Sequence, residues 1–370
     1  MIIKLRQAFD LQMGKTPARN RPDYWNGDHK WISIADIGNA GKFLTKTKES
    51  ITEAGIDGSG IKVVPQGTVI MSFKLSIGKT AITSEDMYTN EAIMAFIDNG
   101  KFAIDTDYLY HLCCGTNWTA GTNKAVMGLT LNKATLLEKE IPLPDINEQH
   151  EIATKLDKID AIIAERQQQL ELIDQAVKSR FIELFGDADR FEAAPLDDNV
   201  EEMFIGPFGS SLKNECFVAA DQGYCMVYEQ KHAIKKTMEV DTRYIDEKKY
   251  KELRRFTVQG GDIIVSCRGT IGETFIIPDG APFGIMHPSI MKIRLKAPAY
   301  NRVFFNHLLQ TVLERHEAEA NGSGVKMAIT ATALGKEHFI LPPMELQEQF
   351  AAFVEQTDKS KLCGKMEVAA

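Results

Sequence analysis

A chain of 370 residues is long enough for two domains of ordinary size and one further element. Apolar residues make up 44% and charged residues 25%, which excludes a disordered or collagen-like chain. The net charge of −8 argues, for the chain as a whole, against a nucleic-acid-binding protein, which is usually basic.

The first 144 residues alternate short apolar runs with glycine turns. The runs at 63–64, 69–71 and 92–97 predict strands, and 107–114 predicts a helix. The stretch 15–28 contains Pro17 and Pro22, so we expect a loop there, and it carries three cations. We interpret residues 1–144 as one α+β lobe.

A long helix is predicted over residues 145–186. Between Pro144 and Gly186 there is no other proline or glycine, and apolar residues recur with alternating spacings of four and three, interrupted only at Arg166 and Arg180. Residues 343–370 begin the same pattern, so we expect a coiled coil, with the C-terminal helix about half as long and antiparallel to the central one. The predicted interface consists of Ile152, Leu156, Ile159, Ile163, Leu170, Ile173, Val177, Leu184, Phe350 and Val354.

Residues 187–342 repeat the first lobe. Segment 67–80 aligns with segment 261–274 with six of fourteen residues identical, and further matches follow in the same order. Strands at 262–265 and 289–293 and a helix at 302–317 complete the pattern. We therefore predict two homologous lobes with twisted, mainly antiparallel sheets, related by a pseudo-twofold axis and separated by the helices.

Catalytic motifs are absent from the sequence. It contains no phosphate-binding G-x-x-x-x-G-K-[ST], no H-E-x-x-H and no G-x-S-x-G. The adenine-methyltransferase signature, Asn or Asp followed by Pro-Pro and an aromatic residue, is missing too. We expect no catalytic residue and no bound metal or cofactor. An independent DNA methyltransferase or nuclease, and a two-lobed scaffold or ligand-binding protein without nucleic acid, remain alternatives.

Polar and basic loops interleaved with aromatic residues favour nucleic-acid binding. The loop 206–213 offers free amides, two hydroxyls and a lysine, which suit phosphate oxygens. Gln230 lies in a predicted loop at 228–232, and a glutamine side chain can form two hydrogen bonds with adenine. Arg268 follows a predicted strand, and an arginine side chain can bind guanine O6 and N7. The DNA-binding candidates are Lys15, Thr16, Arg19, Arg21, Lys30, Lys74, Ser76, Lys79, Lys124, Ser210, Ser211, Lys213, Gln230, Lys231, His232, Arg268, Thr270 and Lys326.

Nearly the whole chain resembles the specificity subunit of type I restriction-modification enzymes. The segments that carry the resemblance, in this order, are 22–28 with 31–33, 141–149, 206–213, 261–274 and 346–361. It implies a non-catalytic subunit whose lobes are target recognition domains, each reading one half of a bipartite, asymmetric DNA site. It also implies that the helices set the spacer and dock two methyltransferase subunits, and that motor-nuclease subunits join them. S-adenosylmethionine, ATP and Mg²⁺ would then serve those partners.

The acidic balance is concentrated in one region. Residues 145–202 contain sixteen Asp and Glu against six Lys and Arg, whereas residues 4–48 contain nine cations against four anions. Because the acidity belongs to the central helix and its exit, the net charge does not argue against DNA binding by the lobes.

No run of 18 apolar residues occurs, and no apolar segment precedes Lys4 and Arg6. We therefore expect a cytoplasmic protein without membrane span or signal peptide. The six cysteines form no C-x-x-C pair, so reduced thiols are expected.

Overall fold

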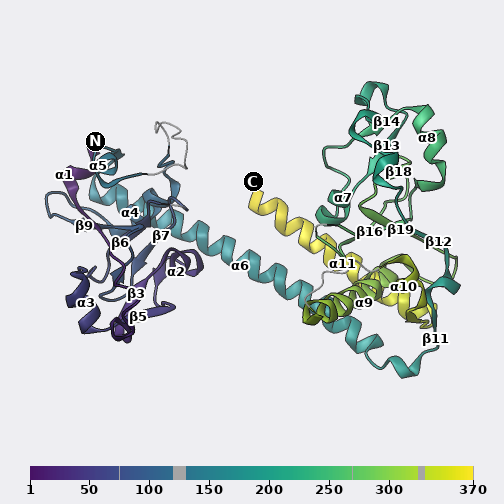
Figure 1. The fold of residues 1–370 in the computed structure, drawn as a ribbon, viewed down its shortest axis with the longest axis horizontal. Coiled ribbons are helices and arrows are strands. Elements are labelled where there is room, and N and C mark those ends of the chain that lie inside the picture. Colours follow the sequence, from purple (N-terminus) through teal and green to yellow (C-terminus); the bar gives the residue numbers. More distant parts are fainter. Residues whose placement is uncertain (75, 120–130, 269, 324–329, 370) are drawn as a thin grey trace. The chain divides into compact units, whose positions relative to one another are not determined.

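The computed structural model describes residues 1–74, 76–119, 131–268, 270–323 and 330–369, with the backbone alone at 319–323 and 362–369. The chain forms two compact units, Met1–Glu165 and Arg166–Ala370. The division falls inside the longest helix, α6 (Ile146–Phe185), which is labelled in Figure 1. Each unit is described by itself.

The first unit contains a five-stranded sheet, a three-stranded sheet and a two-stranded pair. The five-stranded sheet is antiparallel apart from one parallel edge pair and has the order β2 (Phe9–Met13), β9 (Ile93–Asp98), β6 (Val69–Ser72), β7 (Thr80–Thr83) and β4 (Phe43–Leu44). The second sheet consists of β5 (Glu49–Ile51), β3 (Trp25–Ile32) and β8 (Tyr88–Thr89), and β3 and β8 are parallel. The pair is β1 (Ile2–Lys4) with β10 (Glu140–Pro142). The helices that precede α6 are α1 (Leu5–Ala8), α2 (Ile34–Asn39), α3 (Glu53–Ser59), α4 (Thr106–Gly115) and α5 (Lys133–Leu137).

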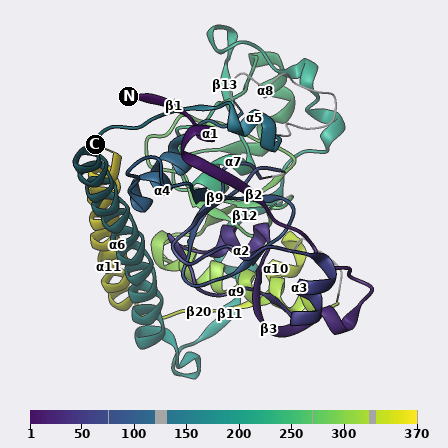
Figure 2. The ribbon, with the colours of Figure 1, turned by 90° about the vertical axis from the view of Figure 1, so that its left-hand side faces the viewer.

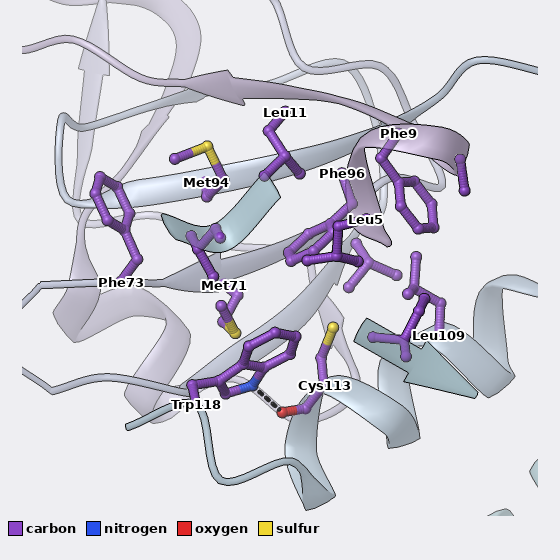
Figure 3. Packing of buried hydrophobic residues seen from close by; sticks show 14 of the residues in the cluster. Leu5, Phe9, Leu11, Met71, Phe73, Met94, Phe96, Leu109, Cys113 and Trp118 are labelled. Carbon is purple, nitrogen blue, oxygen red and sulfur yellow. Dashed lines mark hydrogen bonds between the residues drawn. The ribbon is translucent and has the colours of Figure 1, made fainter. Parts of the chain in front are cut away.

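The central strands of this unit are buried on both faces. Met71 and Phe96 belong to the larger core, which packs against α4, whereas Ile70 and Ala95 point into a second core on the opposite face. Two-sided burial explains why these strands are continuous apolar runs in the sequence. Figure 3 shows the larger core, in which the Trp118 indole donates to the backbone oxygen of Cys113 at 2.8 Å.

The second unit repeats this arrangement after the C-terminal part of α6. Its antiparallel sheet has the order β12 (Val200–Ile205), β19 (Ile290–Leu295), β16 (Ile263–Ser266) and β17 (Thr274–Ile276). The other sheet has the order β14 (Tyr244–Ile245), β13 (Cys225–Tyr228), β18 (Gly284–Met286) and β15 (Thr257–Val258), with β13 and β18 parallel. The two-stranded pair is β11 (Ala193–Pro195) with β20 (His338–Ile340). The helices are α7 (Gln230–Lys235), α8 (Glu247–Leu253), α9 (Arg302–Ser323), α10 (Ala331–Lys336) and α11 (Met344–Ala369).

The duplication extends to individual hydrogen bonds. The backbone N–H of Gly78 donates to the Ser72 oxygen, and that of Gly272 to the Ser266 oxygen, at 2.9 Å each. Both glycines have left-handed backbone angles, with φ of 92° and 88°, which residues with a Cβ rarely adopt. The identical glycines therefore serve the same turn in both lobes, and the predicted repeat is confirmed.

A buried glutamine fixes the start of each long helix in the same way. The Oε1 atoms of Gln149 and Gln347 accept from the backbone N–H groups of Asp105 and Asn301 at 2.9 Å. Their Nε2 groups donate to the proline carbonyl five residues earlier in the chain, at 2.9 and 2.8 Å. Each helix is therefore fastened to its own lobe at its first turn.

Two predicted loops are partly regular structure. Residues 22–24 form a 3₁₀ turn, and Trp25 begins strand β3. Trp31 on the same strand is 2% exposed, so its side chain anchors the strand in the core. Likewise β13 ends at Tyr228 and α7 begins at Gln230. The His232 ring caps this helix because its Nδ1 accepts from the Glu229 N–H at 3.0 Å.

Helix α11 runs beside the C-terminal part of α6 (Figure 2). The Phe350 ring contacts Phe181 and Phe185, with centroids 5.3 and 5.9 Å apart, and Lys361 forms an ion pair with Asp174 at 2.6 Å. Later residues of α11 therefore meet earlier residues of α6, which confirms the predicted antiparallel pairing. At 26 residues, α11 is longer than half of α6, because a single glycine such as Gly364 costs only about 1 kcal/mol in a helix and does not end it.

The predicted interface is only partly correct. Val177, Phe350 and Val354 are buried in the core of the second unit, and Leu170, Ile173 and Leu184 are half-buried there. Half-buried Ile152 and Leu156 lie in the first unit, where Ile152 packs on the lobe.

The prediction is wrong for Ile159 and Ile163, which are 51% and 37% exposed, and it missed Phe181 and Phe185. A straight helix drifts by about 20° per heptad against a 3.5-residue repeat. Over about four heptads this drift adds up to nearly the angle between two successive residues. The buried stripe therefore moves from Arg180 and Leu184 to the next residues, Phe181 and Phe185.

None of the described helices combines the length and apolarity needed to cross a bilayer. The cysteines whose side chains the structure describes are free thiols: Cys113, Cys114, Cys216, Cys225 and Cys267.

Candidate nucleic-acid interface

The two loops predicted to bind DNA begin at the same place in the two lobes. Both follow the first strand of the main sheet, where Gly14 and Gly206 donate to the Ile93 and Ile290 oxygens at 3.3 and 2.9 Å. A Cβ on Gly14 would lie 2.3 Å from the Asn90 oxygen, and one on Gly206 2.3 Å from the His287 oxygen, so neither position accommodates a side chain. Each loop therefore starts against the end of β8 or β18.

That strand end is equivalent in both lobes. The backbone N–H of Asn90 donates to the Ile32 oxygen at 3.0 Å, and that of His287 to the Tyr228 oxygen at 2.8 Å. The start of α2 in the first lobe, or of α7 in the second, lies at the same end of the strands. The turn after β6 or β16 lies there too. We call these two regions the strand-end surfaces.

The strand-end surface of the first lobe gathers four polar side chains. The Thr16 hydroxyl donates to Glu91, and this hydrogen bond lowers the pKa of the Glu91 carboxyl, with Lys74 and Arg19 contributing positive potential. The Lys74 ammonium also lies 5.2 Å from the Phe73 ring centroid. Three of the predicted candidates, Thr16, Arg19 and Lys74, are therefore brought together.

Arg19 is held on two sides. Its guanidinium donates to both carboxylate oxygens of Glu49, the second at 3.1 Å, and lies 3.9 Å from the Trp25 ring centroid. The hydrogen bond that Arg19 donates to Glu49 raises the pKa of Arg19. The guanidinium is therefore oriented although its side chain is 54% exposed.

Most other cations of this lobe are also engaged. Lys15 donates to the backbone oxygens of Ser59 and Gly60 at 3.1 Å each, which satisfies the end of α3. Arg21 pairs with Asp23 at 2.7 Å, and Lys30 pairs with Glu85. Ser76 and Lys79 are exposed on the turn after β6. The candidates Lys124 and Lys326 lie outside the described residues.

The strand-end surface of the second lobe is built around Glu229, which is 7% exposed. Arg243 and Lys231 both bind it, the latter at 2.8 Å. Burial alone would raise the pKa of the Glu229 carboxyl, but these two cations hold it below its usual range. The pKa of neighbouring His287 is lowered by burial, while Glu229 opposes this effect and Arg243, Arg268 and Lys231 add to it.

The remaining candidates of the second lobe differ in access. Arg268 and Thr270 are exposed on the turn after β16. In the loop after β12, Ser210 and Lys213 are exposed and Ser211 is half-buried. Half-buried Gln230 begins α7, and its Oε1 has no hydrogen-bond partner within the described part of the chain.

His232 requires a correction. Its side chain is 0% exposed and its Nδ1 is occupied by the helix cap, so we withdraw it as a DNA contact. Four residues of the strand-end surfaces were not among the predicted candidates: Glu91, Glu229, Arg243 and His287. Only the high content of cations in 230–255, nine against five anions, gave an indication of Arg243. Over the described ranges, no group of three or more His, Cys, Asp or Glu side chains is placed to hold a metal ion.

Comparison with known proteins places this architecture in a family. The sequence model described as the type I restriction modification DNA specificity domain matches residues 1–173 and 212–364. The MjaIX specificity subunit of Methanocaldococcus jannaschii is 28% identical over 193 residues, which cover 51% of this chain and 44% of that protein. The EcoprrI specificity subunit of Escherichia coli is 27% identical over 177 residues, covering 44% and 43%. These matches thus span less than half the length of the relatives.

Two solved structures share the fold. The S subunit of a type I restriction-modification system from M. genitalium aligns with 100% of this chain and 92% of its own, at a TM-score of 0.53 and 14% identity. A chain from a study of complex assembly and conformational transition of the type I R-M system gives a TM-score of 0.57 at 17% identity, with the same coverages. With the family model matching both halves of the sequence, the chain belongs to the type I restriction modification DNA specificity domain family.

Proposed function

We propose that this chain is the DNA-recognition subunit of a type I restriction-modification complex. Each lobe would read one half of a bipartite site in double-stranded DNA. The observation that carries the proposal is the pair of strand-end surfaces, which have the same backbone hydrogen bonds but different side chains. The same framework with different reading groups predicts two different half-sites, and hence an asymmetric target.

The helices would serve protein partners. Residues 145–202 carry sixteen acidic against six basic side chains, and such a segment is repelled by phosphates. We propose that two methyltransferase subunits dock there and that motor-nuclease subunits complete the assembly in the cytoplasm. Adenine methylation with S-adenosylmethionine and ATP-driven cleavage with Mg²⁺ would take place in those subunits, so this chain supplies specificity without catalysis.

The decisive experiment maps methylated adenines in cells that carry this chain together with its methyltransferase. We expect one bipartite motif with unlike halves, and its loss when this chain is deleted. Methylation without this chain, or no bipartite motif with it, would refute the proposal. Binding of a duplex to the assembled complex should also fall steeply with salt, whereas a scaffold without nucleic acid predicts no such binding.

The spacer gives a second test. A heptad inserted between Glu165 and Arg166 lengthens α6 by about 10 Å and nearly preserves its rotational phase. We expect a spacer longer by up to about three base pairs and unchanged half-sites. A variant in which seven exposed residues of α6 are replaced without a change in length is the control. Altered half-sites with an unchanged spacer would contradict the assigned role of the helix.

A further inference from the structure

We propose that Arg19 and Arg243 are the guanine-reading side chains of the two lobes, each positioned by a carboxylate and an aromatic ring. The proposal rests on the proposed function and deepens it, because it assigns one base type in each half-site to one named residue. It adds Arg243, which no sequence motif indicated, and separates Arg19 from the other cations of its loop.

The two arginines are held in the same way by different residues. In the first lobe, Glu49 binds the edge of the Arg19 guanidinium, and the Trp25 ring centroid lies 3.9 Å away. In the second lobe, Glu229 binds Arg243, and the Phe217 ring centroid lies 4.0 Å from its guanidinium. Each guanidinium thus has one edge and one face fixed by the protein.

One member of each pair lies at an equivalent place in the fold. Glu49 pairs with Trp31 in the strand register, and the Arg243 backbone oxygen accepts from the Val227 N–H. Trp31 and Val227 are both the penultimate residues of the central parallel strands β3 and β13. The first lobe thus has the acid, and the second lobe the arginine, beside the penultimate residue of the central strand. Their partners lie at different places, since Arg19 precedes β3 whereas Glu229 follows β13.

Both guanidinium groups also belong to the strand-end surfaces. Arg19 contributes to the potential at Glu91, and Arg243 to the potential at His287. The Arg19 and Arg243 side chains are 54% and 32% exposed, so each retains an accessible edge. Glu229, at 7% exposure, is too buried to contact DNA and acts only through its cations, which makes it a positioning residue.

A guanidinium fixed in this manner suits guanine. Its planar fork carries five N–H donors, and the edge left free by a carboxylate matches the O6 and N7 acceptors of guanine in the major groove. A guanidinium that is already oriented loses less conformational freedom on binding than a mobile one.

Two other exposed arginines differ from Arg19 and Arg243 in how they are held. Arg268 has no ion pair or hydrogen bond among the described residues. Arg21 also has a carboxylate and a ring beside it, but both belong to its neighbours in the chain, Asp23 and Tyr24, and do not tie it to a distant part of the lobe. Mobile or locally bound cations of this kind suit phosphate contacts, which position the protein without reading bases. These two arginines therefore provide matched controls, one in each lobe.

The test uses the full chain with its methyltransferase and compares R19K and R243K with R21K and R268K. Lysine keeps the charge and loses the bidentate fork. We expect R19K to reduce sequence discrimination at one G·C pair in one half-site, and R243K to reduce it at one G·C pair in the other half-site. The expected loss of discrimination at that pair is about 5- to 150-fold. R21K and R268K keep the charge that a phosphate contact needs, so they should leave both half-sites unchanged, and any change in affinity should be the same for all sequences.

Positioning is tested separately with E49Q and E229Q. Each should relax the same base pair as the lysine variant of its lobe, by a smaller factor, with the other half-site as internal control. Discrimination is measured by competition between the cognate duplex and one substituted at the G·C pair, so a variant with slow methylation still gives a result. Thermal unfolding that matches the parent chain verifies folding.

Several outcomes overturn the inference. The first is a loss of discrimination in R268K or R21K in place of R243K or R19K. The second is a loss of discrimination in both half-sites from one variant. The third is a loss at an A·T pair, and the fourth is a half-site without any G·C pair. Absence of a bipartite motif for the parent chain is a different result, since it refutes the proposed function itself.

Discussion

Acidification should destabilise the second unit through His307. This histidine lies in α9 with its ring against Phe350, the two centroids 5.1 Å apart. Burial lowers its pKa to about 4, while Asp358 opposes this shift and Lys236 and Lys361 add to it. In the unfolded chain its pKa is near 6.5.

The sign and size of the effect follow from proton linkage. Between pH 6.5 and about 4 the unfolded state binds a proton at His307 that the folded state does not, so folding stability falls as the pH is lowered through this window. Above pH 6.5 both states carry the neutral ring and the penalty vanishes. Since one pKa unit corresponds to about 1.4 kcal/mol, lowering the pH from 8 to 5 should cost about 2 kcal/mol at this site.

The sequence provides a way to follow the two units separately. The three tryptophans, Trp25, Trp31 and Trp118, all lie in the first unit, so tryptophan fluorescence reports its unfolding by urea, while circular dichroism reports both units. The variant His307→Gln should weaken the pH dependence of the dichroism transition by about 2 kcal/mol and leave the fluorescence transition unchanged. An unchanged pH dependence, or an equal shift in both transitions, would refute the assignment of the proton to His307.

Three further substitutions test the packing of each unit. Phe350→Ala removes a ring from the aromatic cluster that joins α6, α9 and α11 and should cost about 3–5 kcal/mol in the dichroism transition; a loss below 1 kcal/mol would mean that the helices repack. Asp262 binds the Arg294 guanidinium at 2.7 Å, so Asp262→Ala leaves Arg294 without its buried partner and should cost a similar free energy of unfolding. Asp262→Asn should recover part of that stability. Asp157→Asn weakens the contacts of α6 with His111 and Lys42 and should shift the unfolding of the first unit, followed by tryptophan fluorescence, by about 1 kcal/mol, and by less at high salt. A shift independent of salt would exclude an ionic origin.

The duplicated framework was predictable because its constraints are local. Gly78 and Gly272 are identical because their turns require a left-handed backbone, and Gln149 and Gln347 recur because each satisfies the same backbone groups. Such positions tolerate little substitution, so they remain visible when the rest of the two lobes has diverged. The absence of proline and glycine from 145–185 predicted the helix for a similarly local reason.

The reading groups were not predictable because their partners are distant in the chain. Arg19 and Glu49 are 30 residues apart, and Glu229 and Arg243 are 14 apart, and no periodicity connects them. His232 looked like a loop histidine because Tyr228 to His232 gives no helical pattern long enough to detect. The shift of the helix interface toward Phe181 and Phe185 depends on an accumulated angular drift, which a fixed heptad pattern does not contain.

The distribution of charge separates affinity from specificity in this chain. The cations that a sequence count assigns to DNA are mostly bound already: Lys15 to carbonyl groups, Arg21 and Lys30 to acids, Arg19 to Glu49. Each must exchange a partner before it neutralises a phosphate, so such cations add less to affinity than free ones. A carboxylate beside an arginine thus lowers non-specific attraction while it fixes the direction of the guanidinium. Lobes that are nearly neutral and carry oriented arginines can therefore discriminate between sequences without binding every duplex tightly.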